Sequence, residues 1–140
     1  MYDAALFVLN KDKKLKKIIS SVGECKIRII SNPFEALVEA IITQQISDSA
    51  GKTISLKFKN LFGKKYPTPS DIIKLSKDEI KSVGLSRMKA EYILDISQMI
   101  VDKKLDFKIF KKMSNEDVIS ELTKIRGIGR WTAEMYLIFA

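Results

Sequence analysis

The residues of this sequence that could do chemistry gather near its end, between Lys124 and Thr132. Gly127 and Gly129 bracket one apolar residue, Ile128, which we expect to plug the turn into the core, so the backbone can turn sharply and approach another backbone closely. The amide groups that begin the next helix lack intrahelical partners and attract anions. Three basic side chains add positive charge: Lys124, Arg126 and Arg130. The string therefore predicts a phosphate site, although a bare Gly-x-Gly can also merely separate two packed helices.

The composition restricts which chemistry is open to the chain. It has 140 residues with no histidine and one cysteine, which excludes an imidazole base, a histidine-ligated metal, an internal disulfide and an iron–sulfur cluster held by this sequence. Catalysis would have to rest on carboxylates, lysines, hydroxyls or backbone dipoles. The 25 Lys and Arg against 17 Asp and Glu give a net charge of +8, which points to a polyanionic partner, with nucleic acid as the first candidate.

The apolar pattern predicts one all-α domain that positions this string. Apolar residues recur with helical spacing through most of the chain, and only Lys26 to Ile30 could pass for a strand. Caps and prolines predict helices that begin at or just after these positions: Pro33, Ser47, Thr68, Ser76, Ser86, Ser114 and Arg130. Apolar stretches are too short to span a membrane, and the start lacks a secretory pattern. We therefore expect a cytoplasmic protein with no membrane partner.

The lysine run from Lys11 to Lys17 has two interpretations. It could bind a polyanion, or it could be the solvated face of a helix that turns Leu15, Ile18 and Ile19 inward. The spacing favours the second interpretation.

A repeat relates two parts of the chain at an offset of 43 residues. The segment Val83 to Glu91 aligns with Arg126 to Glu134, and both copies are typical of a helix, a glycine, a tight turn and a second helix.

The hairpin at residues 122–133 resembles the helix-hairpin-helix of the HhH-GPD DNA glycosylase superfamily, and the chain is similar to its 3-methyladenine DNA glycosylase II branch. Four segments carry the resemblance in order: Pro33 to Val38, Gln44 to Ser47, Gly84 to Tyr92 and Gly127 to Ala133. It implies the all-α HhH-GPD fold, with residues 1–31 in a second subdomain and residues 32–140 in the HhH-GPD domain.

The resemblance also implies a partner and roles for single residues. Members of the family flip a damaged base out of double-stranded DNA. The residues matching the DNA-backbone grip are Lys124, Arg126, Gly127, Gly129, Arg130 and Thr132; the wedge that fills the vacated stack is Gln45, and the base pocket includes Trp131 and Met135. Backbone carbonyls of Thr123, Ile125 and Ile128 match a site for Na⁺ or K⁺, and no other cofactor is expected. We expect a monomer.

The residues alone leave two of these roles open. Gln44 and Gln45 could simply cap neighbouring groups at a helix end, and Trp131 could be a core or hairpin-anchoring residue.

The resemblance distinguishes between two reaction routes. The superfamily's glycosylase-lyases have a lysine where this sequence has Trp131, so a monofunctional route is expected in which water displaces the base. The family's catalytic Asp lies beyond the helix that follows the hairpin, and no residue here matches it. We therefore expect the reading frame to continue past Ala140, and the 140 residues alone to be inactive. Glu134 has a counterpart in Glu91, which favours ion pairing over catalysis. The alternative function is a noncatalytic helix-hairpin-helix module that binds DNA backbone without sequence preference.

Overall fold

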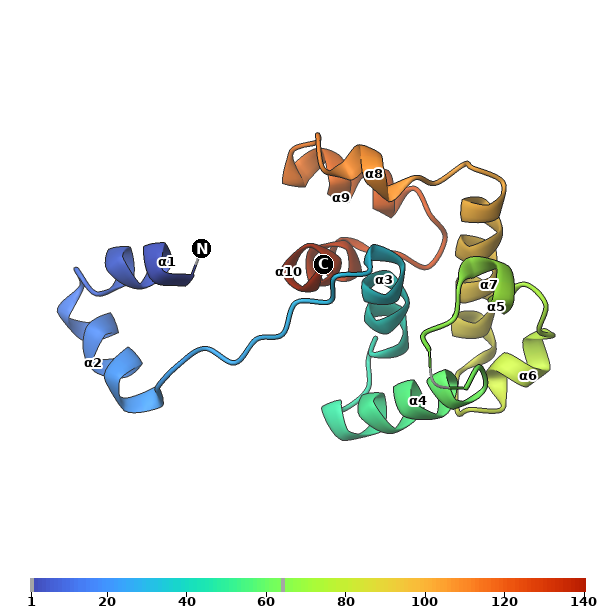
Figure 1. Ribbon diagram of the computed structural model, residues 1–140, viewed down its shortest axis with the longest axis horizontal. Coiled ribbons are helices and arrows are strands. Elements are labelled where there is room, and N and C mark those ends of the chain that lie inside the picture. The colour runs from blue at the N-terminus through green and yellow to red at the C-terminus, as the bar shows by residue number, and fades with distance from the viewer. Residues whose placement is uncertain (1, 64) are drawn as a thin grey trace.

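The structure is a computed structural model that describes residues 2–63 and 65–140, and these residues form ten α-helices and no strand (Figure 1). The helices are α1 (Tyr2–Leu9), α2 (Lys13–Val22), α3 (Pro33–Ile42), α4 (Asp48–Asn60), α5 (Pro69–Ile72), α6 (Lys77–Lys81), α7 (Arg87–Val101), α8 (Phe107–Phe110), α9 (Asn115–Thr123) and α10 (Arg130–Phe139). The predicted all-α class is confirmed. None of the described helices is both long and apolar enough to cross a membrane.

The predicted helix starts are confirmed, and local side chains cap all of them except the start of α10. Asn32 accepts from the backbone amide of Phe34 ahead of α3, with Pro33 at the first helical position. Thr68 and Ser76 each complete a capping box with the acidic residue three positions later. Helix α4 ends at Asn60 and α6 at Lys81, so Gly63 and Gly84 lie in the turns that follow.

Helix α3 forms the centre of the core and is packed against α4, α7 and α10. Seven of its ten residues are buried, and Leu37 and Ile41 are fully inaccessible. Each such side chain contributes about 1.5–3 kcal/mol relative to an exposed one. Helix α10 also contacts α9, while the short helices α5 and α6 lie against α7. The loop after α3 and the turns before α7 and α10 are therefore anchored to one core.

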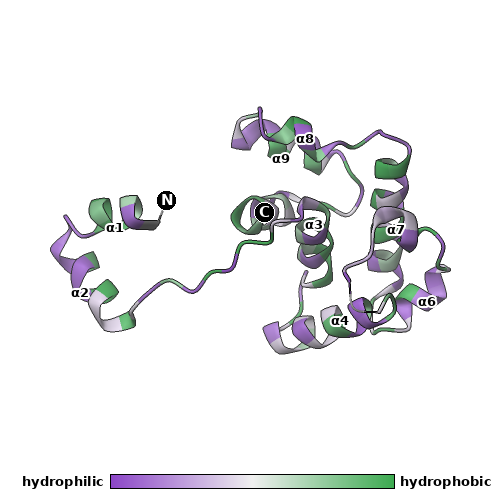
Figure 2. Ribbon diagram, viewed as in Figure 1, coloured by the Kyte–Doolittle hydropathy of each residue, from purple (hydrophilic) through white to green (hydrophobic). Residues whose placement is uncertain are grey.

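Helices α1 and α2 lie away from this body, connected to it by an extended segment (Figure 1). Lys13 to Lys17 do lie in a helix, but the expectation that Leu15, Ile18 and Ile19 turn inward is wrong. Leu15 and Ile18 are 39% and 55% exposed, and no residue of α2 is buried. Figure 2 shows green apolar stretches on these two helices, and neither packs on the body. Lys26 to Ile30 is extended without strand pairing; the Ile30 amide donates to the Phe139 carbonyl at 2.6 Å.

Candidate nucleic-acid interface

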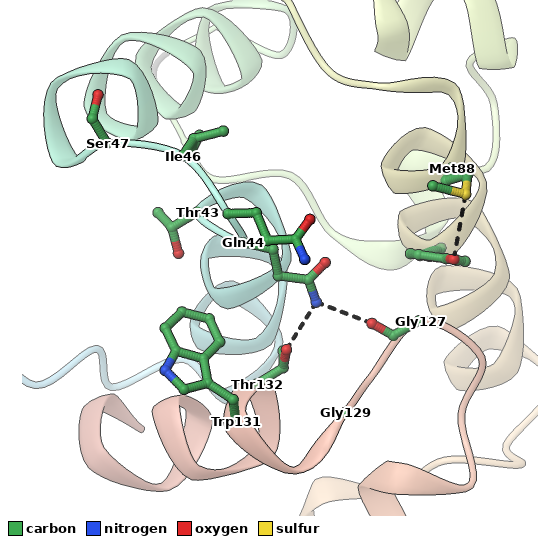
Figure 3. A pocket seen from close by; sticks show the side chains of 11 residues that line it. Thr43, Gln44, Ile46, Ser47, Met88, Gly127, Gly129, Trp131 and Thr132 are labelled. Atoms are coloured by element: carbon green, nitrogen blue, oxygen red, sulfur yellow. Dashed lines mark hydrogen bonds between the residues drawn. The ribbon is translucent and has the colours of Figure 1, made fainter.

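Three segments distant in sequence meet around one cavity of about 810 Å³ (Figure 3). They are the loop after α3, the first turns of α7, and the hairpin between α9 and α10. The lining residues are Thr43, Gln44, Gln45, Ile46, Ser47, Met88, Tyr92, Gly127, Gly129, Trp131 and Thr132. The structure thus brings together the predicted wedge, both hairpin glycines and the predicted pocket tryptophan.

The first hairpin glycine is required by both conformation and packing. Gly127 has φ +87°, in the left-handed region, and a Cβ atom there would overlap the Tyr92 ring. The neighbouring Ile128 is 4% exposed, so it plugs the turn into the core as expected.

The second hairpin glycine, Gly129, is required by neither its backbone conformation nor its packing. Gly129 has φ −88°, which any residue adopts, and a Cβ atom there would meet nothing within 4 Å. It is the N-cap of α10, and it leaves that helix without a side-chain cap. The N-terminus of α10 therefore has free space at the point where its unsatisfied amides could receive an anion.

Arg130 stands beside this helix start and pairs with two carboxylates. Its guanidinium lies 2.7 Å from Glu116 and 2.9 Å from Glu134, which confirms the predicted ion-pairing role of Glu134. The hydrogen bonds from Arg130 hold the pKa of the Glu116 carboxyl below its usual value. Arg130 and Glu116 are largely exposed and Glu134 is partly exposed, so water screens the pairs and Arg130 can exchange a carboxylate for another anion.

The other two predicted basic contacts are also paired. Lys124 Nζ lies 2.5 Å from Glu121, and the Arg126 guanidinium lies 2.8 Å from Asp95 and stacks over the Tyr92 ring at 5.5 Å. Both basic side chains are exposed at the rim of the hairpin. Their predicted contact with a DNA backbone stays a prediction.

The loop after α3 presents Gln45, the predicted wedge, in an unusual conformation. Gln45 is exposed and has φ +53°, in the left-handed region that disfavours residues other than glycine. The preceding Gln44 does not cap its own helix with its side chain. Its Nε2 instead donates to the Gly127 carbonyl at 3.0 Å and to Thr132 Oγ1 at 2.8 Å (Figure 3). The side-chain amide of Gln44 thereby joins the loop to the hairpin.

Lys89 on α7 also holds this loop. Its Nζ donates to the Ile42 carbonyl at 2.9 Å and to the Gln44 carbonyl at 2.7 Å. Burial lowers the pKa of the Lys89 ammonium below its usual value. Sequence analysis missed the roles of Lys89 and Gln44. The repeat held a signal, because Lys89 aligns with Thr132, which also contacts Gln44.

Trp131 is 52% exposed and lines two cavities, so it is not a core residue. The second cavity, of about 350 Å³, lies between α3 and α10 and includes Met135, the other predicted pocket residue. The two cavities share Thr43, Ile46 and Trp131. Both volumes fall in the range of about 300–1,000 Å³ that is usual for ligand sites.

The predicted cation ligands lie where α9 ends. Thr123 is the last residue of that helix and Ile125 follows its C-cap, so their carbonyls belong to a helix terminus. The Ile125 carbonyl accepts from the Ile128 amide at 3.1 Å, which closes the turn. Carbonyl oxygens suit hard cations, so the donor type fits Na⁺ or K⁺, and the cation site stays a prediction.

Comparison with known proteins gives a match over most of the chain. Residues 38–134 match the family described as HhH-GPD superfamily base excision DNA repair protein. The alkylbase DNA glycosidase-like protein mag2 of Schizosaccharomyces pombe is 32% identical over 133 residues, covering 91% of this chain and 62% of that protein. DNA-3-methyladenine glycosylase 1 of the same yeast is 31% identical over 130 residues, covering 91% of this chain and 57% of its own length.

Solved structures agree with these relatives. The S. pombe 3-methyladenine DNA glycosylase Mag1 in complex with abasic DNA superposes with a TM-score of 0.80 at 30% identity, covering 91% of this chain and 65% of that one. The Archaeoglobus fulgidus 3-methyladenine DNA glycosylase gives a TM-score of 0.84 at 29% identity, covering 100% of this chain and 50% of that one. The chain therefore spans about half to two thirds of the length of these relatives.

Proposed function

The chain belongs to the HhH-GPD superfamily of base excision DNA repair proteins, and from this premise we propose that it recognises damaged bases in double-stranded DNA and serves their removal by a monofunctional N-glycosylase. The bases are alkylated purines of the 3-methyladenine type, as the names of its relatives indicate. The observation that carries the proposal is an open helix N-terminus directly beside a cavity that has Gln45 and Trp131 in its lining.

The hairpin supports a grip on the DNA backbone. Because nothing in the fold requires glycine at Gly129, its lack of a side chain is explained by an approaching group, and a phosphate fits the amides of α10. Arg130 adds an exchangeable positive charge next to the same amides. Such contacts position a duplex without reading its sequence. A cation on the carbonyls of the hairpin would add positive charge at this grip.

The cavity supports base flipping. A flipped base has to be replaced in the stack and received elsewhere. The exposed amide of Gln45 can enter the stack and hydrogen-bond the orphaned partner base. The half-exposed face of Trp131 can stack on an alkylated, positively charged base through a cation–π attraction.

Trp131 also supports the monofunctional route. Its indole offers no amine to attack the sugar, so water would displace the base while a carboxylate stabilises the cationic sugar. Glu134 pairs with Arg130 and is not assigned that role.

Binding to defined duplexes tests this function. We expect the chain to bind a duplex with an abasic-site analogue at least tenfold more tightly than the undamaged duplex, measured by fluorescence anisotropy. Trp131→Ala should reduce this preference, whereas Phe7→Ala, which removes an exposed aromatic ring on α1, should retain it. Equal affinity for both duplexes would instead support the noncatalytic module.

Borohydride reduction tests the monofunctional route. The chain incubated with abasic DNA and borohydride should give no covalent protein–DNA adduct, because that adduct requires a Schiff base from a lysine. A trapped adduct would contradict the route, and its position in the protein would identify the lysine.

A further inference from the structure

Both repeat copies form hydrogen bonds with one residue, Gln44. Lys89 of the first copy and Thr132 of the second occupy equivalent positions, 43 residues apart. Lys89 binds the backbone carbonyl of Gln44, and Thr132 accepts from the Gln44 side chain. We propose, on the basis of the proposed function, that Lys89 is a positioning residue. It fixes Gln44 in the loop after α3, so that the residue after Gln44, Gln45, projects as a wedge.

The conformation of Gln45 shows that this loop has to be held. A backbone φ of +53° is sterically disfavoured for a residue with a side chain, and it persists only where the surrounding contacts determine it. Gln45 itself is exposed, so the contacts come from its neighbours. The bonds to Gln44 from Lys89, and from Gln44 to the hairpin, lie directly before it in the chain.

Lys89 is chemically suited to this role. The carbonyls of Ile42 and Gln44 lie at the C-terminus of α3, where carbonyls lack intrahelical donors and the helix dipole is negative. One ammonium group supplies donors to both carbonyls together with a complementary charge. Because Lys89 is half-buried, water replaces these donors poorly when the ammonium is removed.

The hairpin grip does not depend on Lys89. Gly127 is fixed by its packing against Tyr92, and Gly129 is the N-cap of α10 in the second copy. Removal of the Lys89 ammonium should therefore impair insertion of the wedge while backbone binding is retained. A residue that only stabilises the fold would affect both together.

Fluorescence of 2-aminopurine, which rises when the base leaves the stack, separates these effects. On a duplex with 2-aminopurine next to an abasic-site analogue, the unsubstituted chain should raise the fluorescence at saturation. Lys89→Met should reduce that rise at least fivefold, with less than a twofold change in affinity for undamaged duplex. Lys89→Arg, which retains donors and charge, should recover part of the rise. Lys81→Met, an exposed lysine on α6, should behave like the unsubstituted chain.

A double substitution tests whether Lys89 acts through the wedge. Gln45→Gly removes the wedge side chain and adopts φ +53° without strain. Lys89→Met should add no further loss in the Gln45→Gly background. A full additional loss there, or an unchanged rise in Lys89→Met alone, would overturn the proposal. If the unsubstituted chain gave no rise at all, the proposed function itself would fail.

Discussion

The two copies of the repeat have the same framework and differ at the start of their second helix. In both, a glycine with positive φ precedes a buried plug and an Arg–Glu pair four residues apart: Gly84, Leu85 and Arg87–Glu91 in the first; Gly127, Ile128 and Arg130–Glu134 in the second. Ser86 then caps α7 with its own hydroxyl, whereas Gly129 leaves α10 uncapped. The first copy caps its second helix with its own side chain, whereas the second copy leaves the corresponding helix end open.

The copies also differ in how tightly their first glycine is packed. A Cβ atom on Gly127 would overlap the Tyr92 ring, whereas one on Gly84 would lie 3.5 Å from Ile54, an ordinary contact. The hairpin of the second copy thus packs on a side chain of α7, the helix that the first copy begins.

The largest expected effect comes from alanine at these two glycines. Both substitutions incur about 1–2 kcal/mol of left-handed strain. Gly127→Ala adds an overpacking cost of about 1–3 kcal/mol against Tyr92. We therefore expect the free energy of unfolding in urea to fall clearly more for Gly127→Ala than for Gly84→Ala. Equal losses would show that Tyr92 simply moves aside.

Substitutions at the two N-cap residues, Ser86 and Gly129, should separate effects on folding stability from effects on DNA binding. Ser86→Ala should lower the free energy of unfolding by about 1 kcal/mol and leave DNA affinity unchanged, because it removes only a helix cap. Gly129→Ser should leave stability equal or higher, yet weaken DNA binding about tenfold, because its hydroxyl would occupy the amides offered to a phosphate. If Gly129→Ser bound DNA normally, the open helix end would have no role in binding.

The paired arginines allow a test of charge alone. Arg130→Ala should reduce the slope of log affinity against log salt by about one, as expected for the loss of one phosphate contact. The equivalent Arg87→Ala should leave that slope unchanged, because α7 is already capped. A similar decrease in both variants would mean that the first copy also touches the DNA backbone.

The smallest expected effect concerns the carboxylate that competes for Arg130. Glu116→Gln should raise DNA affinity about twofold at low salt, because Arg130 then has only one of its two charged partners, Glu134, to leave. Asp102→Asn makes the same change in net charge at a pair with Lys104, outside the hairpin. Only an increase beyond that control supports competition at Arg130.

Local signals in the sequence predicted much of the fold. Helix starts depend on a cap and the next few residues, so Pro33, Ser76 and Ser114 predicted them correctly. The buried face of α3 followed from apolar spacing for the same reason. The exposure of Leu15 could not be predicted, because burial depends on whether another element covers that face.

The candidate site was only partly predictable. Gly127, Gly129 and Trp131 stand in one short string whose types already indicate a turn and an aromatic platform. Gln44 and Lys89 were missed because their bonds join residues 45 to 88 positions apart, beyond any local pattern. The pairs of Arg130 with Glu116 and of Arg126 with Asp95 were also not predicted, because these partners lie 14 and 31 positions apart in the sequence.

The side-chain amide of Gln44 has a consequence for how DNA would be inspected. It joins the loop before Gln45 to the hairpin that carries Gly129. These hydrogen bonds hold the proposed wedge residue at a set distance from the proposed phosphate site. If this distance is kept when DNA binds, the duplex has to deform so that it contacts both points. Sites with weakened stacking deform at lower cost, and selection for damage would thus begin before any base enters the pocket.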